Sequence, residues 1–200
     1  MVETDRRREI VDAASSLFRE HGYSGTSVRE IARAVDMQGA SLYAHVASKQ
    51  DVLWSIVESM AIRFEIAADS VEVADPGAIV FGRGVQLISL VRAHVGVVTD
   101  DVERASVFVH EWRALSSGRR EEIAARRDAY EARFRATIAG GVQTGTFTTV
   151  DPPVATAYIL TALNGLVTWY RPDGRWSARE VAEAFADLTL RSVQARESRA

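Results

Sequence analysis

The spacing of apolar side chains predicts a chain made of helices. Over residues 5–20 they recur at i, i+3, i+4, i+7 and i+8, which is one face of a helix: Ile10, Ala13, Ala14, Leu17 and Phe18. The pattern breaks at "HGYSG", where a glycine can take the left-handed conformation that closes a helix. Four prolines and similar 3.6-residue patterns further along favour an all-α protein.

Shorter helices follow this first one. The stretch "SVREIARAV" begins with Ser27 and Glu30 at capping-box spacing, so each side chain can bond a backbone N–H of the first turn. A turn at Asp36 is expected next, because Asp tolerates unusual backbone angles better than most residues. A third short helix is predicted over about 39–46, and a fourth begins near residue 48.

Longer apolar patterns occupy the remainder of the chain. The periodicity lapses around residues 66–75, so we predict two domains, residues 1–66 and 67–200. The second domain is expected to contain five longer helices, at about 76–99, 101–115, 119–140, 153–171 and 178–195.

The composition limits the class of protein. Hydrophobic residues make up 47% and charged residues 26%, as in globular proteins, and the net charge is −3. Contact with nucleic acid must therefore rest on local charge. There is no cysteine to form disulfides or thiolate metal sites, and "MVETDRRREI" lacks the apolar centre of a signal peptide. We expect a cytoplasmic protein that has no membrane span.

Two helices joined by a short turn describe a helix-turn-helix unit, whose second helix enters the DNA major groove. If Leu42 and Val46 face inward, a helical wheel points Ala40 and Ala44 outward and leaves a slim face for the groove. Tyr43 and His45 then flank that face and point toward the phosphates. Residues at the helix start are expected to read bases, and they are Gln38, Gly39, Ala40 and Ser41.

Several residues are candidates for phosphate contact. Lys49 is the only lysine and lies in the first turn of the fourth helix, where free backbone N–H groups already favour an anion. Thr26 precedes the second helix and can offer a hydroxyl or an N–H. Arg6, Arg7 and Arg8 form a basic arm, and Arg29 projects from the second helix. An alternative role for these four arginines is to form an ordinary solvent-exposed surface without contacting DNA.

These residues together resemble the DNA-binding domain of the TetR family of transcriptional regulators. The resemblance covers residues 8–57 and rests on motifs that include "GY", "TS", "IA", "LY" and "SK". It implies phosphate contacts by Thr26, Tyr43, His45 and Lys49, and base contacts by residues 38–41. The chain departs from the family pattern at four positions, one of which is Gly39, where the family frequently has a basic residue. The other three are as follows. Asp36 replaces a frequent Gly, Gln38 a Ser-type cap, and Val46 an aromatic residue.

The second domain is expected to form a dimer and bind a ligand. "AYILTALNGLVTWY" and "AREVAEAFADLTLRSV" are apolar on several faces, and two copies of this helical hairpin can form a four-helix bundle. Candidate pocket residues are Phe108, Trp112, Tyr130, Phe134, Asn164 and Trp169, each of which also fits an ordinary core position. The region resembles TetR-type regulators of catabolism, some of which respond to acyl-CoA. Candidate partners of CoA phosphates are Arg127, Arg133, Arg171 and Arg175.

The favoured function is a ligand-released repressor of a palindromic operator. A non-specific architectural DNA-binding protein is an alternative, and an all-α enzyme is less favoured because no nucleophile elbow or glycine-rich phosphate loop occurs. No catalytic residue, cofactor or metal ligand is assigned. His94 and His110 could belong to a metal site, but a buried histidine with hydrogen-bond partners or an exposed histidine is the favoured interpretation of each.

Overall fold

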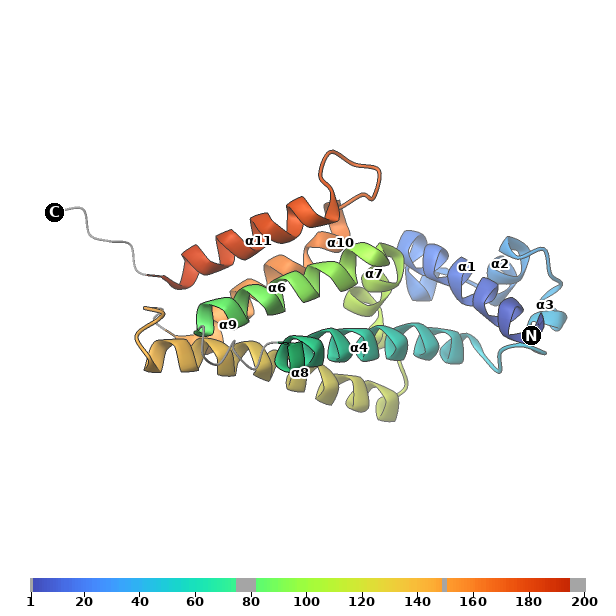
Figure 1. Ribbon diagram of the computed structural model, residues 1–200. Helices are drawn as coiled ribbons and strands as arrows, with labels where there is room; N and C mark the ends of the chain where they lie inside the picture. Colours follow the sequence, from blue (N-terminus) through green and yellow to red (C-terminus); the bar gives the residue numbers. More distant parts are fainter. Residues whose placement is uncertain (1, 75–81, 149–150, 195–200) are drawn as a thin grey trace. The chain divides into compact units, whose positions relative to one another are not determined.

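A computed structural model describes residues 2–74, 82–148 and 151–194 of the chain (Figure 1). Every regular element in these ranges is a helix, which confirms the predicted all-α class. The chain divides into two compact units, neither of them continuous in sequence. Unit 1 comprises Met1–Ile62 and Glu103–Arg126, and unit 2 comprises Arg63–Val102 and Arg127–Ala200. The predicted division between residues 66 and 67 stays a prediction.

Unit 1 contains the short helices and a later segment of the chain. Its elements are α1 (Val2–Gly25), α2 (Val28–Ala34), α3 (Gly39–Leu42), the first part of α4 (Lys49–Ala74), most of α7 (Val102–His110), the 3-10 helix η1 (Trp112–Ala114) and the start of α8 (Ser117–Gln143). Helix α2 packs against both α1 and α3. Ile10, Phe18, Ile31, Leu42 and Leu53 are buried at the centre. The predicted inner face of these helices is therefore confirmed.

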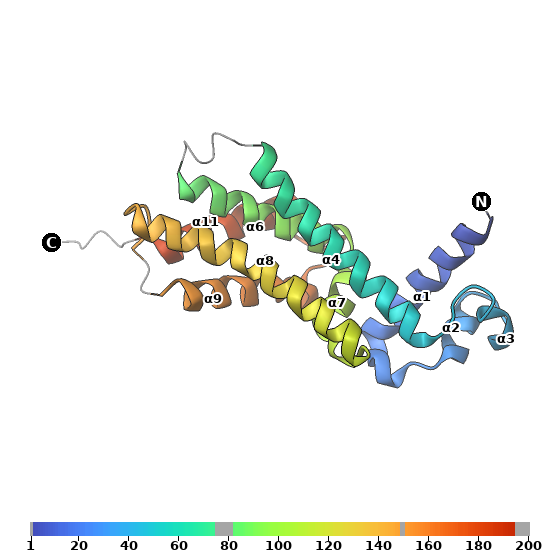
Figure 2. The same cartoon turned by 90° about the horizontal axis from the view of Figure 1, so that it is seen from below.

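Unit 2 is built around α6 (Arg83–Asp100). Helix α11 (Ala178–Val193) packs along α6, and both contact α9 (Pro152–Asn164) (Figure 1). Figure 2 shows α8 running alongside α4, and Arg133 of α8 pairs with Asp69 of α4 at 2.6 Å. Ser177 and Glu180 form a capping box at the start of α11.

The turn after α8 ties two helices of unit 2 together. Phe147 donates its backbone N–H to the Gly141 carbonyl at 3.0 Å, and its ring is buried against that glycine. A β-carbon on Gly141 would lie 2.0 Å from the Phe147 ring, so only glycine fits there. Thr148 then donates its N–H to the Val193 carbonyl of α11 at 2.9 Å.

Three predicted helix boundaries were wrong. The helix expected over 39–46 ends at Leu42, because the bonds from Ala44 and His45 tighten to i→i+3 spacing. The helix expected over 153–171 is interrupted at Gly165 and resumes as α10 (Leu166–Trp169). Glycine favours such a break because it has the weakest helix propensity after proline. Helix α4 continues through the expected lapse to Ala74.

Other boundaries shift less. The helix expected over 101–115 becomes α7 followed by η1, and the one expected over 119–140 becomes α8 with a few more residues at each end. The start expected at residue 76 lies outside the described residues, within which this helix begins at Arg83. Among the described residues, no helix is both long enough and apolar enough to span a membrane.

Candidate nucleic-acid interface and aromatic core

The turn between α2 and α3 sets the direction of the recognition segment. Ser27 and Glu30 form the predicted capping box at the start of α2. Asp36 lies in the turn that the sequence predicted and has φ of 53°, a left-handed conformation. The Met37 N–H donates to the Ala32 carbonyl at 2.8 Å, which ends α2 and redirects the chain. Local chemistry therefore shapes the helix-turn-helix.

The recognition segment presents a slim face to solvent. Leu42 and Val46 are 1% and 2% exposed, so they anchor the segment as predicted. Solvent reaches the opposite side, where Gln38, Ala40, Ser41 and Ala44 are exposed and Gly39 is partly exposed. Gln38 makes no side-chain cap, in agreement with the sequence, so its amide remains at the surface of the helix start. This face can approach a groove closely because its side chains are small.

Tyr43 and His45 flank this face in different environments. The Tyr43 ring is 55% exposed. His45 is half-buried, and its Nδ1 atom is buried with no hydrogen-bond partner among the described residues. Arg7 donates to the His45 carbonyl at 3.4 Å, across the chain from α1. The two side chains therefore differ in how freely they can reach a phosphate.

Lys49 and Thr26 are engaged within unit 1. The Lys49 ammonium donates to the carbonyls of Tyr23 and Thr26 at 2.8 and 2.7 Å, and lies 4.1 Å from the centre of the Tyr23 ring. The Thr26 side chain is buried, and its hydroxyl donates to the Gly22 carbonyl at 2.9 Å. Both residues thus hold the bend where α1 kinks at Gly22. Phosphate contact by either residue stays a prediction.

The basic arm predicted before the first helix is instead part of α1. Arg6 lies within α1, pairs with Glu9 and donates to the Val35 carbonyl at 2.9 Å. Arg7 and Arg8 are exposed on the same helix, and Arg29 is exposed on α2. Helix α1 begins at Val2, so the three arginines project from a helix and not from an arm that precedes it.

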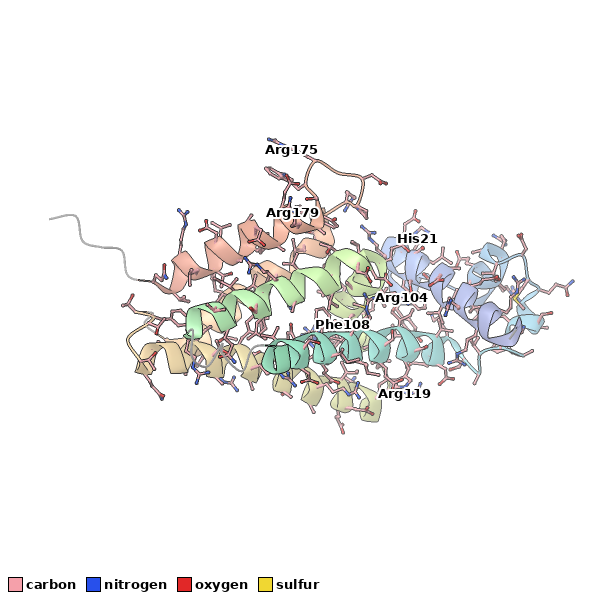
Figure 3. All side chains as sticks on the ribbon, in the orientation of Figure 1. His21, Arg104, Phe108, Arg119, Arg175 and Arg179 are labelled. Atoms are coloured by element: carbon pink, nitrogen blue, oxygen red, sulfur yellow. The ribbon has the colours of Figure 1, made fainter. Side chains whose placement is uncertain are left out.

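Gln50 forms a junction that the sequence did not reveal. Its amide nitrogen donates to the Tyr23 hydroxyl at 2.9 Å and to the Ala114 carbonyl at 2.7 Å. Its amide oxygen accepts the Ser116 N–H at 3.2 Å. Arg119, labelled in Figure 3, pairs with the neighbouring Asp51 at 2.6 Å. The segment around η1 is thereby fastened to the start of α4, within unit 1.

Helices α4, α6 and α8 bring aromatic side chains together inside unit 2. His94 packs on Phe64, with ring centres 4.8 Å apart, and its Nδ1 lies 3.1 Å from the Tyr130 hydroxyl. Tyr130 also packs on Phe64 and Phe134, at 5.5 and 5.6 Å. Two of the predicted pocket residues, Tyr130 and Phe134, are thus in contact. The apolar periodicity of the sequence placed His94 in the helix that is now α6, but it did not indicate that Tyr130 would be its partner.

The other predicted pocket residues lie elsewhere. Phe108 and Trp112 belong to unit 1, where Phe108 is buried and Trp112 stacks with Arg113. Asn164 is half-buried at the end of α9. Trp169 is 47% exposed and stacks on Phe185, with ring centres 6.2 Å apart, so it lies at the surface of unit 2.

The four arginines considered for CoA phosphates also differ in position. Arg133 is engaged with Asp69. Burial lowers the pKa of His94, and the charge of Arg127 lowers it further, which places Arg127 near that ring. Arg171 and Arg175 are exposed in the turn before α11, where Figure 3 labels Arg175. No group of three or more His, Asp or Glu side chains that could hold a metal ion occurs within the described residues.

Comparison with known proteins identifies the family. Residues 10–56, which include the helix-turn-helix, match the profile described as bacterial regulatory proteins of the tetR family. Residues 85–193 match the profile of the tetracyclin repressor-like C-terminal domain. The chain belongs to the TetR family. TetR-family proteins are DNA-binding transcriptional regulators, so the prediction of a regulator made from the sequence is confirmed at this level.

Individual relatives align with nearly the whole length of this chain. The TetR-family regulator PfmR of Thermus thermophilus is 33% identical, covers 93% of this chain and 99% of its own, and superposes with a TM-score of 0.78. AibR, solved with isovaleryl coenzyme A and operator DNA, is 28% identical over 92% of this chain and 97% of its own, with a TM-score of 0.77. The repressor KstR2 of Rhodococcus jostii is 23% identical over 94% of this chain and 91% of its own.

Proposed function

We propose that this protein is a homodimeric repressor that binds a palindromic operator and is released by an acyl-CoA-type or other small hydrophobic effector. The observation that carries the proposal is the slim, exposed face of α3 on a TetR-family scaffold. Buried Leu42 and Val46 fix that face, while Gln38, Ala40 and Ser41 remain accessible. Such a regulator acts in the cytoplasm, where its operator lies.

Base reading is assigned to the start of α3. Gln38 can form a bidentate contact with adenine, and the methyl group of Ala40 can touch a thymine methyl. Tyr43 and His45 flank this face and are proposed to contact phosphates, with additional contacts from Arg7, Arg8 and Arg29. Lys49 and Thr26 hold the supporting bend. Phosphate contact by Thr26 remains part of the proposal, whereas the Lys49 ammonium is proposed to serve the bend alone.

The dimer is proposed to form through the last helices. Helices α9 and α11 are in contact and carry large apolar side chains that solvent reaches. Val154 and Tyr158 of α9 are 66% and 64% exposed, and Leu188 of α11 is 62% exposed. A second copy would cover them and place two recognition helices on one operator. Replacing Leu188 with Glu should give monomers in analytical ultracentrifugation, whereas Ile66→Glu, an exposed position on α4, should leave the dimer intact.

The effector class rests on two supports. AibR, a relative by sequence and fold, was solved with isovaleryl coenzyme A. In this chain, the aromatic cluster of Phe64, His94, Tyr130 and Phe134 supplies apolar surface with a few polar atoms, which is typical of small-molecule sites. Arg127 adds positive charge close to this cluster.

Footprinting on genomic fragments selected by the purified protein tests the proposal. We expect protection of a single palindrome, and release of the DNA when acyl-CoA thioesters of graded chain length are added. The coupling must be reciprocal, so operator DNA should weaken acyl-CoA binding by the same factor. Uniform weak protection would support the architectural role instead. A protected palindrome that no thioester releases would contradict the effector class and leave the DNA-binding function standing.

A further inference from the structure

The aromatic cluster of unit 2 contains a polar pair that is only half satisfied. His94 is 2% exposed, and its Nδ1 lies 3.1 Å from the Tyr130 hydroxyl. The other ring nitrogen, Nε2, is buried and has no hydrogen-bond partner in the part of the chain that the structure describes. A buried polar atom without a partner costs stability, because it has lost its hydrogen bonds to water. A leucine or phenylalanine would fill this place without that cost.

The imidazole is neutral at physiological pH. Burial, with a smaller contribution from the charge of Arg127, lowers the pKa of His94 to about 3. Burial also raises the pKa of Tyr130, so its hydroxyl keeps its proton. A neutral imidazole carries one proton, and the hydrogen bond made by one nitrogen decides which nitrogen holds it.

The hydrogen bond with the Tyr130 hydroxyl indicates that the single imidazole proton of His94 is on Nε2. A phenol is a far stronger acid than a neutral imidazole N–H, so the phenol donates and Nδ1 accepts. His94 therefore presents Nε2–H as a buried donor. Positive charge from Arg127 reaches His94, and Arg133 acts similarly on Tyr130. These surroundings favour a ligand atom that is rich in electrons and accepts a hydrogen bond.

We propose that His94 Nε2–H is the donor that recognises a carbonyl oxygen on an otherwise apolar effector, with Tyr130 as the residue that orients the imidazole. Phe64, which packs on both rings of this pair, and Phe134, which packs on Tyr130, supply the apolar surface. The inference rests on the proposed function, because it assigns a chemical feature to the effector of that same region. A thioester or a ketone carries this feature, whereas a thioether or an alkane of the same length does not.

The test compares pairs of ligands that differ only in the carbonyl group. Isothermal titration of the full-length protein would use isovaleryl-CoA against S-(3-methylbutyl)-CoA, and octanoyl-CoA against S-octyl-CoA. In the wild-type protein we expect the thioester of a pair to bind at least tenfold more tightly than its thioether, because only the carbonyl satisfies the buried donor. In His94→Phe this ratio should fall below twofold.

Phe134→Leu is the matched control. It changes the same cluster without touching a polar atom, so it should weaken both ligands of a pair and leave their ratio unchanged. Tyr130→Phe removes the hydroxyl that orients the imidazole, and it should reduce the ratio while His94 is still present. Equal affinities for thioester and thioether in the wild-type protein would overturn the inference and leave an acyl-CoA effector standing.

A second measurement does not depend on the probes. The double variant His94→Phe, Tyr130→Phe removes both polar groups and keeps the ring shapes, so the unliganded protein should melt no lower than wild type. If neither probe pair binds the wild-type protein, the proposed acyl-CoA effector fails. The melting temperature of the double variant, compared with that of wild type, then decides the role of His94. A double variant that melts clearly lower would show that the pair serves stability and would overturn the inference.

Discussion

Replacing Lys49 with methionine separates two roles for the lone lysine. The variant keeps the aliphatic stem and removes the ammonium, which donates to the carbonyls of Tyr23 and Thr26 at 2.8 and 2.7 Å. Hydrogen bonds from a charged donor contribute about 1.5–3 kcal/mol each, and partial exposure reduces this. We therefore expect the free energy of unfolding to fall by roughly 2–4 kcal/mol, as measured by urea denaturation followed by circular dichroism.

The dependence of operator affinity on salt distinguishes the two roles. Each phosphate that a lysine or arginine side chain neutralises contributes about 0.9 to the slope of log affinity against log salt. Because the ammonium is used by two backbone carbonyls, we expect Lys49→Met to weaken binding through loss of the folded bend and to leave the slope unchanged. Tyr43→Phe should weaken binding with normal stability, since this ring is 55% exposed, and should also leave the slope unchanged, because the hydroxyl carries no charge. Lys49→Met with full stability and a slope lower by about one would refute this reasoning and make Lys49 a phosphate ligand.

Four further predictions follow from packing and protonation. Gly141→Ala should cost at least about 1–3 kcal/mol of unfolding free energy, since its β-carbon would meet the Phe147 ring at 2.0 Å. Gly96→Ala, which meets nothing within 4 Å on α6, should gain roughly 0.5–1 kcal/mol in the same urea assay. The lowered pKa of His94 means that the unfolded state takes up a proton first, so stability should fall by about 1.4 kcal/mol per pH unit below about 6.5. His94→Phe should abolish that component, and an unchanged pH profile would contradict it. Hydrogen bonds from Ser48, and then Arg119, lower the pKa of Asp51, so its stabilising effect is present above the ordinary value of 3.8 and is lost at lower pH. Asp51→Asn should flatten the acid limb of the stability profile in that range.

Features set by local chemistry were predicted well from the sequence. The capping box of Ser27 and Glu30 involves side chains three residues apart, and the conformation of Asp36 follows from the turn in which it lies. Leu42 and Val46 are buried because helical periodicity fixes their direction. Each of these predictions requires only a few neighbouring residues.

Features that join distant segments were missed. The bonds of Gln50 span 64 residues to Ala114, and the contact between His94 and Tyr130 spans 36. No periodic pattern in one segment specifies which side chain of another will lie opposite. The break at Gly165 was also missed, since apolar residues continue through it and conceal the change of direction. Tertiary packing decides the first two, whereas the low helix propensity of glycine favours the third.

The junction at Gln50 bears on how TetR-type regulators can be recombined. Unit 1 includes Glu103–Arg126 as well as the first helices, and Ala114, Ser116 and Arg119 of that segment hold the start of α4. A hybrid that grafts a foreign helix-turn-helix onto this chain at a single crossover would separate Gln50 from these partners. Transfer of operator specificity therefore requires two exchanged segments, or the retention of Tyr23, Gln50 and Asp51 in the graft.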